Sequence, residues 1–172
     1  RTVTLFGSPG AGPMDHASGF GPGVDVYVAA SSTDAFTWRG GERPGARGNF
    51  MNGLGVDPAM DFFGAHRITA EFPLTQMTST GDYDVHNFYY KFVDKSAGQR
   101  NESLANFGRI AAGLSERVQL EGHRTVVTRA DHTTKVHDPA ATRQARPDDR
   151  GFDPAHNCAH GVANVLSDRY GR

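Results

Sequence analysis

Short, largely apolar runs separated by turn residues fill the first third of the chain. Residues 3–6 predict a buried strand that ends at a Gly-Ser-Pro-Gly turn. Residues 24–30 predict a second strand, which ends at the turn and cap residues 31–34. Residues 39–55 are typical of a loop, and residues 67–72 favour a third, short strand. The apolar runs therefore indicate buried strands rather than long helices.

Farther along the chain the hydrophobic spacing changes to that of a helix. Asn101 is a good N-cap for a helix from Glu102 to Ala112, and Gly113 is a natural stop. Apolar strands that end in polar loops and are followed by a helix indicate part of a parallel α/β sheet. The buried stripe expected on the helix is Leu104, Phe107 and Ile110.

Aromatic residues divide the sequence in two. Fifteen of the 17 lie at or before Phe107, whereas five of the eight histidines follow Gly113. A stretch so poor in aromatics can bury little apolar area of its own. We therefore assign residues 1–114 to a folded core. Residues 115–172 are assigned to a polar, His-rich extension with a short helix near 154–168.

Composition excludes several classes of protein. The net charge is −1, with 18 basic and 19 acidic side chains, so we expect no nucleic-acid partner. No apolar run reaches the ~18 residues that a membrane helix needs, so we expect no transmembrane segment. The single cysteine excludes an internal disulfide framework and a four-cysteine zinc site.

A carboxylate and a histidine form the most informative pair. Asp34 follows the second predicted strand, at the end of the sheet where α/β proteins build their sites. His86 lies in a stretch that we expect to be a loop. They occur in the order of the last two members of a Ser-Asp-His triad, in which the carboxylate orients the imidazole. The alternative is structural: Asp34 would cap a helix, and His86 would be a packed surface residue.

Three separated stretches resemble one known family. The first runs from Leu5-Phe6-Gly7-Ser8-Pro9-Gly10 into Asp15-His16. The second is Gly55-Val56-Asp57-Pro58 with Phe63-Gly64-Ala65, and the third is His86 with the segment 102–113. In this order they resemble an α/β-hydrolase family common in actinobacteria, long catalogued only as a domain of unknown function. The resemblance covers residues 3 to about 114 and implies the C-terminal part of a serine hydrolase that acts on esters.

By this resemblance Asp34 is the catalytic acid and His86 the catalytic base. The family's nucleophile lies in an elbow upstream of the first strand, and no G-x-S-x-G occurs in these 172 residues. We therefore expect a separate N-terminal hydrolase fragment to carry the serine, which makes the assembly heteromeric and the chain a processed or split product. The alternative is a non-catalytic structural or assembly subunit that keeps part of the hydrolase fold.

Other candidate chemistry is weaker. Ser8 could replace the missing nucleophile only with difficulty, because Pro9 removes the amide that would line an oxyanion hole. The glycine-rich turn at residues 7–12 lacks the Lys-Ser/Thr of a phosphate loop. His156 and His160 share a helix face but have no third ligand at a fixed spacing. We expect no metal and no cofactor.

The aromatic residues near His86 have two interpretations. They could line a pocket for an ester or acyl small molecule, or they could form core. Phe36 and Trp38, directly after Asp34, suit a pocket wall or lid. Substrate identity, compartment and oligomeric state stay open, although processing would be compatible with a secreted or cell-envelope location. The residues in question are Phe62, Phe63, Phe88, Tyr89, Tyr90 and Phe92.

Overall fold

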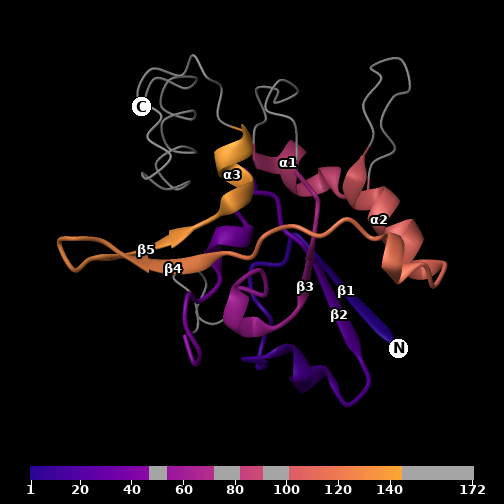
Figure 1. The fold of residues 1–172 in the computed structure, drawn as a ribbon, viewed down its shortest axis with the longest axis horizontal. Coiled ribbons are helices and arrows are strands. Elements are labelled where there is room, and N and C mark those ends of the chain that lie inside the picture. Colours follow the sequence, from indigo (N-terminus) through magenta and orange to yellow (C-terminus); the bar gives the residue numbers. More distant parts are fainter. Residues whose placement is uncertain (47–53, 72–81, 91–100, 145–172) are drawn as a thin grey trace.

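The structure is a computed structural model that describes residues 1–46, 54–71, 82–90 and 101–144. Its centre is a three-stranded parallel sheet in the order β1-β2-β3 (Figure 1). The strands are β1 (Thr2–Phe6), β2 (Asp25–Ala29) and β3 (His66–Ile68). β1 and β2 lie close to their predicted ranges, whereas β3 is shorter than the predicted 67–72 and begins one residue earlier. The α/β class is confirmed at this coarse level.

Alternation along β2 builds a core on each face of the sheet. Val26, Val28 and Ala30 point to one face, which loops and 3-10 turns cover, with Phe63 at its centre. Tyr27 and Ala29 point to the other face, which the α-helices cover. All but the first residue of β2 is buried, as expected for the central strand of a parallel sheet. The turns are η1 (Ala17–Phe20), η2 (Thr37–Arg39), η3 (Asp61–Phe63) and η6 (Ser115–Arg117).

His86 lies in a helix, α1 (Asp82–Phe88), and not in the loop that we predicted. The prediction was wrong because the polar residues of this stretch obscured a helical spacing. Val85, Phe88 and Tyr89 are all buried, and positions i, i+3 and i+4 share one helix face. His86 lies between the buried residues Val85 and Phe88, and its imidazole reaches Asp34 at the carboxyl end of β2.

The helix expected after Asn101 is present as α2 (Glu102–Ala111), and the Asn101 side chain accepts a hydrogen bond from Leu104 N–H. Its buried face differs from the predicted stripe: Ser103 and Asn106 are buried with Ile110, whereas 42% of Phe107 is exposed. The side chain of Asn106 is hydrogen-bonded to backbone groups beside β3, which explains why a polar residue holds the central position.

The later part of the described chain leaves the sheet and returns to it. β4 (Thr125–Thr128) and β5 (Thr134–His137) form an antiparallel hairpin that projects from the body, and α3 (Pro139–Gln144) follows it (Figure 1). Arg124, Val136 and Asp138 are nevertheless buried. The helix predicted near 154–168 lies outside the described residues. No described helix is long and apolar enough to cross a bilayer.

The two edges of the sheet differ. Residues 119–121 run antiparallel along β3: Thr69 N–H donates to Gln119 O at 2.9 Å, and Glu121 N–H donates to Arg67 O at 2.8 Å. Asn106 holds this segment by accepting from Gln119 N–H at 3.0 Å. Within the described residues, nothing pairs with the outer edge of β1. One edge is therefore closed by the chain itself, whereas no described segment pairs with the other.

Candidate active site

The acid loop, residues 30–39, leaves the carboxyl end of β2 and carries Asp34. This side chain is fully buried. Its Oδ1 accepts a hydrogen bond from Phe36 N–H at 2.9 Å, which forms the tight turn that starts η2. Asp34 is not the helix cap of the structural alternative, because the N-cap of η2 is Phe36 and no side chain caps it. The turn uses only one carboxylate oxygen of Asp34, and the second oxygen, Oδ2, has other partners.

Asp34 and His86 are in direct contact. His86 Nδ1 lies 3.0 Å from Asp34 Oδ2, although 52 positions separate them in the sequence. The His86 side chain is 33% exposed, while that of Asp34 is inaccessible to solvent. Because Nδ1 is in contact with the buried carboxylate, the other ring nitrogen, Nε2, points away from Asp34. The structure therefore brings together the two residues that the sequence singled out.

Close packing fixes the imidazole ring in this position. The Phe36 ring lies against it, with ring centroids 4.5 Å apart. Gly7, directly after β1, also packs against the ring. A Cβ at this glycine would lie 3.0 Å from two atoms of His86 and 2.8 Å from Tyr89. With φ at 54°, the backbone there also favours glycine. The turn that opens the family resemblance thus packs against the candidate base.

Tyr89 is a member of the site that the sequence reasoning assigned to a pocket wall or to core. Its hydroxyl lies 2.8 Å from Asp34 Oδ2 and accepts a hydrogen bond from Ser31 N–H at 2.9 Å. Burial, and then the negative charge of Asp34, raises the pKa of Tyr89 well above its usual value. The signal in the sequence was the spacing of three from His86, but it is legible only once the stretch is known to be helical.

Arg124 supports the acid loop from below. Its guanidinium donates to Thr37 Oγ1 at 2.9 Å, to Thr37 O at 3.0 Å and to Ser31 O at 3.2 Å. It also lies 3.8 Å from the centre of the Trp38 ring. Trp38 therefore packs on this cation, while its indole N–H donates to Ser32 O at 3.0 Å. Three loop positions on either side of Asp34 are held by one side chain.

Arg124 belongs to a buried charge network. Arg67 and Arg124 both bind Asp138, each at 2.8 Å, and Arg124 binds Asp57 at 2.8 Å. Burial tends to raise the pKa of Asp138, but the two arginines outweigh it and leave that pKa lowered. Burial tends to lower the pKa of Arg124, and Asp57 and Asp138 reverse this and raise it. The network thus stays charged and links the loop to the segment before α3.

Glu71 makes a second support at the start of the acid loop. It accepts hydrogen bonds from Ser32 N–H at 2.9 Å and from Ser32 Oγ at 2.7 Å. Burial raises its pKa, and the nearby Arg67 only partly offsets this. Glu71 therefore fixes the first turn of the acid loop, and Arg124 holds positions on both sides of Asp34. Neither residue was found from the sequence, because contacts across the fold leave no local pattern.

The remaining candidates have other roles. Ser8 Oγ donates to Gly10 O at 2.6 Å, so it completes its own turn. The amides of Ala11 and Gly12 donate to the backbone of residues 54–56, which occupies part of the suspected phosphate loop. Among the described residues, no group of three metal-binding side chains is found. Several further candidates, His156, His160 and Phe92, lie outside the described residues.

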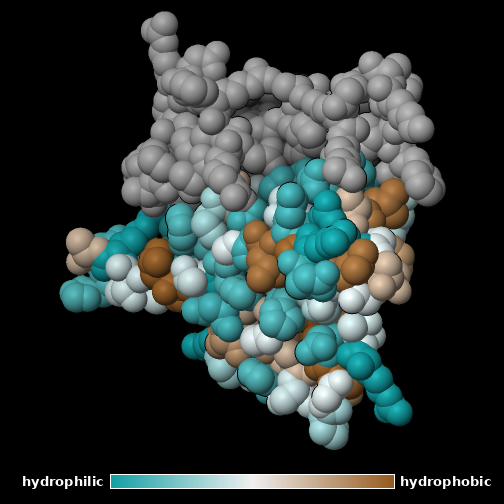
Figure 2. Space-filling view, turned by 45° about the vertical axis from the view of Figure 1, so that its right-hand side comes forward, coloured by the Kyte–Doolittle hydropathy of each residue, from teal (hydrophilic) through white to brown (hydrophobic). Residues whose placement is uncertain are grey.

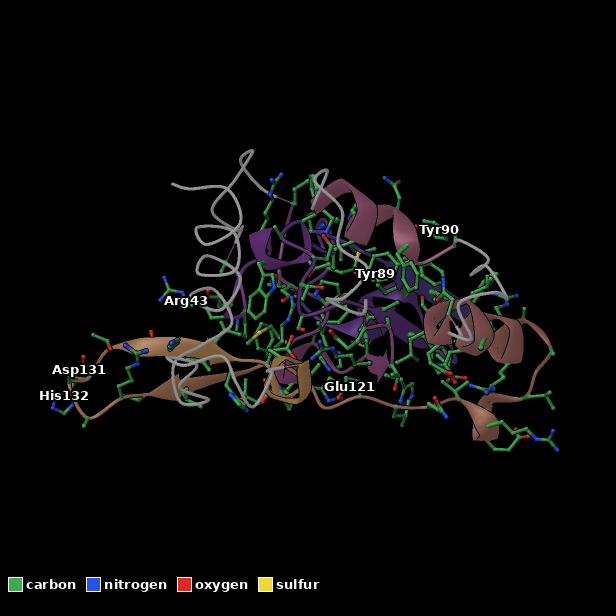
Figure 3. All side chains as sticks on the ribbon, turned by 90° about the horizontal axis from the view of Figure 1, so that it is seen from above. Arg43, Tyr89, Tyr90, Glu121, Asp131 and His132 are labelled. Atoms are coloured by element: carbon green, nitrogen blue, oxygen red, sulfur yellow. The ribbon has the colours of Figure 1, made fainter. Side chains whose placement is uncertain are left out.

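The suspected aromatic pocket is mostly core. Phe63, Phe88 and Tyr89 are buried, whereas Tyr90 is 57% exposed. Figure 3 labels both tyrosines, with Tyr89 inside the body and Tyr90 nearer its margin. Phe36, which lies against His86, is the one aromatic of the acid loop that borders the candidate base. It is therefore the best-placed candidate for a pocket wall.

Comparison with known proteins gives two relatives. The chain is 31% identical over 132 residues to proteins from two strains of Mycobacterium tuberculosis, each named only as an uncharacterized protein. The alignment covers 70% of this chain but 19% of each relative, so the chain spans about a fifth of their length. No protein-family model matches the chain. No solved structure matches it significantly.

Proposed function

We propose that this chain is the C-terminal part of a serine hydrolase of the α/β-hydrolase type, which cleaves esters or related acyl compounds. Asp34 is the acid and His86 the base of the triad. The observation that carries the proposal is the 3.0 Å contact between His86 Nδ1 and the buried Asp34 Oδ2 at the carboxyl end of β2. A serine on a segment outside these 172 residues supplies the nucleophile.

The reaction follows from the orientation of the imidazole. Asp34 holds the proton on Nδ1, so Nε2 takes the proton of the serine hydroxyl as its oxygen attacks the acyl carbonyl. The imidazolium then gives that proton to the leaving alkoxide, and an acyl-enzyme remains. Water, deprotonated by Nε2, attacks the acyl-enzyme, and the imidazolium gives the proton taken from water to the departing serine oxygen, which releases the acid. The oxyanion donors, like the serine, belong to the missing segment.

The open edge of β1 suggests where this segment binds. Residues of β1 after the first are only half-buried, unlike those of β2. Unpaired backbone groups along a parallel strand favour addition of a further strand. Gly7, directly after β1, packs against the His86 ring, so a parallel strand beside β1 would finish near that ring. The greater length of the two relatives is compatible with such a segment.

Hydrolysis of p-nitrophenyl esters by the native protein, with any polypeptide that co-purifies, tests the proposal. We expect His86→Ala to reduce kcat/KM by about 10³-fold or more. His66→Ala is the matched control, because His66 is an exposed histidine at the opposite end of the sheet. Equal activity of the two variants would contradict the proposal. An inactive native protein would favour the non-catalytic assembly subunit instead.

A further inference from the structure

The hydroxyl of Tyr89 occupies a defined place in a chain of hydrogen bonds. Ser31 N–H can only donate, so at 2.9 Å it uses a lone pair of the tyrosine oxygen. The hydroxyl proton is then directed at Asp34 Oδ2, 2.8 Å away. Ser31 therefore donates to Tyr89, and Tyr89 donates to Asp34. An ionised Asp34 has no proton to donate, so these hydrogen bonds cannot reverse their direction.

The same carboxylate oxygen serves His86. Asp34 Oδ2 lies 3.0 Å from Nδ1 of the imidazole and 2.8 Å from the phenol oxygen, while Oδ1 accepts from Phe36 N–H. An ionised carboxylate offers only lone pairs, so each of its three neighbours must donate. This fixes the proton of neutral His86 on Nδ1 and leaves Nε2 as the acceptor that a base requires.

We propose that Tyr89 is a positioning residue that sets the basicity of His86 by sharing the carboxylate oxygen that binds it. A donated hydrogen bond withdraws electron density from Oδ2, so the carboxylate stabilises the imidazolium less than it would alone. Loss of the Tyr89 hydroxyl should therefore strengthen the interaction between Asp34 and a protonated His86. For its kinetic consequence this inference rests on the proposed hydrolase function, but the effect on His86 does not.

Tyr89 is suited to this role because it remains a donor. Burial and the charge of Asp34 raise its pKa well above its usual value, so the hydroxyl keeps the proton that it donates. Its ring is also perpendicular to the imidazole, with centroids 6.5 Å apart, and packs against Gly7. Tyr89 thus packs beside the His86 ring and donates a hydrogen bond to Asp34, the carboxylate that contacts His86.

Helix α1 carries two further charged residues besides His86, Asp82 and Asp84. Asp34 faces the ring from the acid loop, and Tyr89 faces it from α1. Arg39 lies 4.3 Å from the centre of the Phe36 ring, which itself lies against His86. Tyr90 follows Tyr89 in the sequence. Gly7, directly after β1, contacts the ring and carries no charge. A change at Tyr89 therefore alters a major electrostatic influence on the imidazole and leaves Asp34 and Arg39 in place.

The test is an NMR titration of the histidines in the 172-residue protein, with the His86 signal assigned through His86→Gln. We expect Tyr89→Phe to raise the pKa of His86 by about one unit, a tenfold gain in proton affinity. Tyr90→Phe is the matched control, because Tyr90 is 57% exposed and is expected to leave that pKa unchanged. A His86 pKa that falls, or moves by less than about 0.2 unit, in folded Tyr89→Phe overturns the inference.

A second variant covers the case in which Tyr89→Phe does not fold. Replacement of Tyr89 by 3-fluorotyrosine keeps the hydroxyl but makes it more acidic and a stronger donor. We expect the pKa of His86 to fall, opposite in sign to the first variant, and an unchanged or raised value overturns the inference. In the hydrolytic assembly, we expect Tyr89→Phe to move the acidic limb of the pH profile of kcat/KM to higher pH by the same number of pH units. A shifted His86 without any hydrolysis upholds the positioning role and removes the proposed function.

Discussion

The two edges of the sheet differ in what covers them: the edge at β3 is paired and lies beside a buried charge network, whereas the edge at β1, near His86, is unpaired within the described residues. Beyond β3, residues 119–121 pair with the strand, and the arginine and aspartate network behind them is buried. Beyond β1, the described chain offers no pairing, and Tyr90 and Phe107 are exposed beside Phe6. Figure 2 shows separate hydrophobic residues, in brown, among hydrophilic ones on one face of the described part of the molecule.

The candidate site lies between these two regions. Asp34 belongs to the closed side, because Arg124 holds the loop around it from the segment before the hairpin. His86 belongs to the open side, because it packs on Gly7 at the end of β1. The chain thus completes the support of the acid by itself. We infer that the other half of the site is completed by whatever covers β1.

The largest effect is expected from breaking the closed side at Arg124. Arg124→Met leaves Asp57 without the arginine that binds it and removes three hydrogen bonds from the acid loop. We expect a loss of about 3–5 kcal/mol in the free energy of unfolding, measured by urea titration. The control is Arg117→Met, since the Arg117 side chain is 70% exposed and should change stability by less than about 0.5 kcal/mol. Similar losses for both variants would show that the network does not stabilise the closed side.

A smaller effect is expected from titration of the same network. Arg67 and Arg124, against the opposing effect of burial, lower the pKa of Asp138 below its ordinary 3.8. The folded state therefore favours the ionised form, and this stabilisation is complete above pH 3.8 and is lost as the pH falls through the folded-state pKa. Asp138→Asn lacks it at every pH.

We therefore expect the difference in unfolding free energy between wild type and Asp138→Asn to be about 3 kcal/mol at pH 6 and to narrow in acid. Urea titrations from pH 6 to about pH 2.5 measure it. Glu71, whose raised pKa acts in the opposite direction, is present in both proteins, but the charge of Asp138 contributes to that raised pKa. Asp138→Asn therefore also lowers the pKa of Glu71, and the variant Glu71→Gln in both backgrounds removes this contribution from the comparison. A gap that stays constant with pH would contradict the assignment of the charge pair.

The smallest effect concerns the open edge, and hydrogen exchange measures it residue by residue. Gly7 N–H donates to Ala29 O, and Arg1 O accepts from Asp25 N–H, so odd-numbered residues of β1 face β2. The amides of Thr4 and Phe6 then face outward. We expect them to exchange at least about tenfold faster than those of Val3 and Leu5, and to become protected when a further strand is bound. Equal protection in the isolated chain would mean that this edge is already covered.

The strands were predictable because each is a local apolar run with a turn after it. Residues 3–6 and 24–30 anticipate β1 and β2 closely. The N-cap of α2 was predictable for the same reason, since Asn101 acts on its own first turn. The Asp34–His86 pair could also be proposed from the sequence. Asp34 follows a predicted strand, His86 comes later in the chain as in a Ser-Asp-His triad, and the family resemblance implies the same two residues.

The supports of the site were not predictable, because they depend on contacts between distant segments. Arg124 reaches Thr37 across 87 positions, and nothing in the local sequence marks either residue. Phe107 was expected inside the core because it fits the apolar stripe, but Asn106 takes the buried position through its bonds to the segment that closes β3. Polar residues that satisfy a sheet edge therefore override hydrophobic periodicity.

Mapping the serine that reacts with a fluorophosphonate probe tests the central claim most directly. The native protein, with any partner polypeptide, is labelled, digested and sequenced by mass spectrometry. We predict that the labelled serine lies outside these 172 residues and that His86→Ala abolishes labelling while His66→Ala does not. Labelling of a serine within this chain, such as Ser8, or labelling that persists in His86→Ala, would contradict the account.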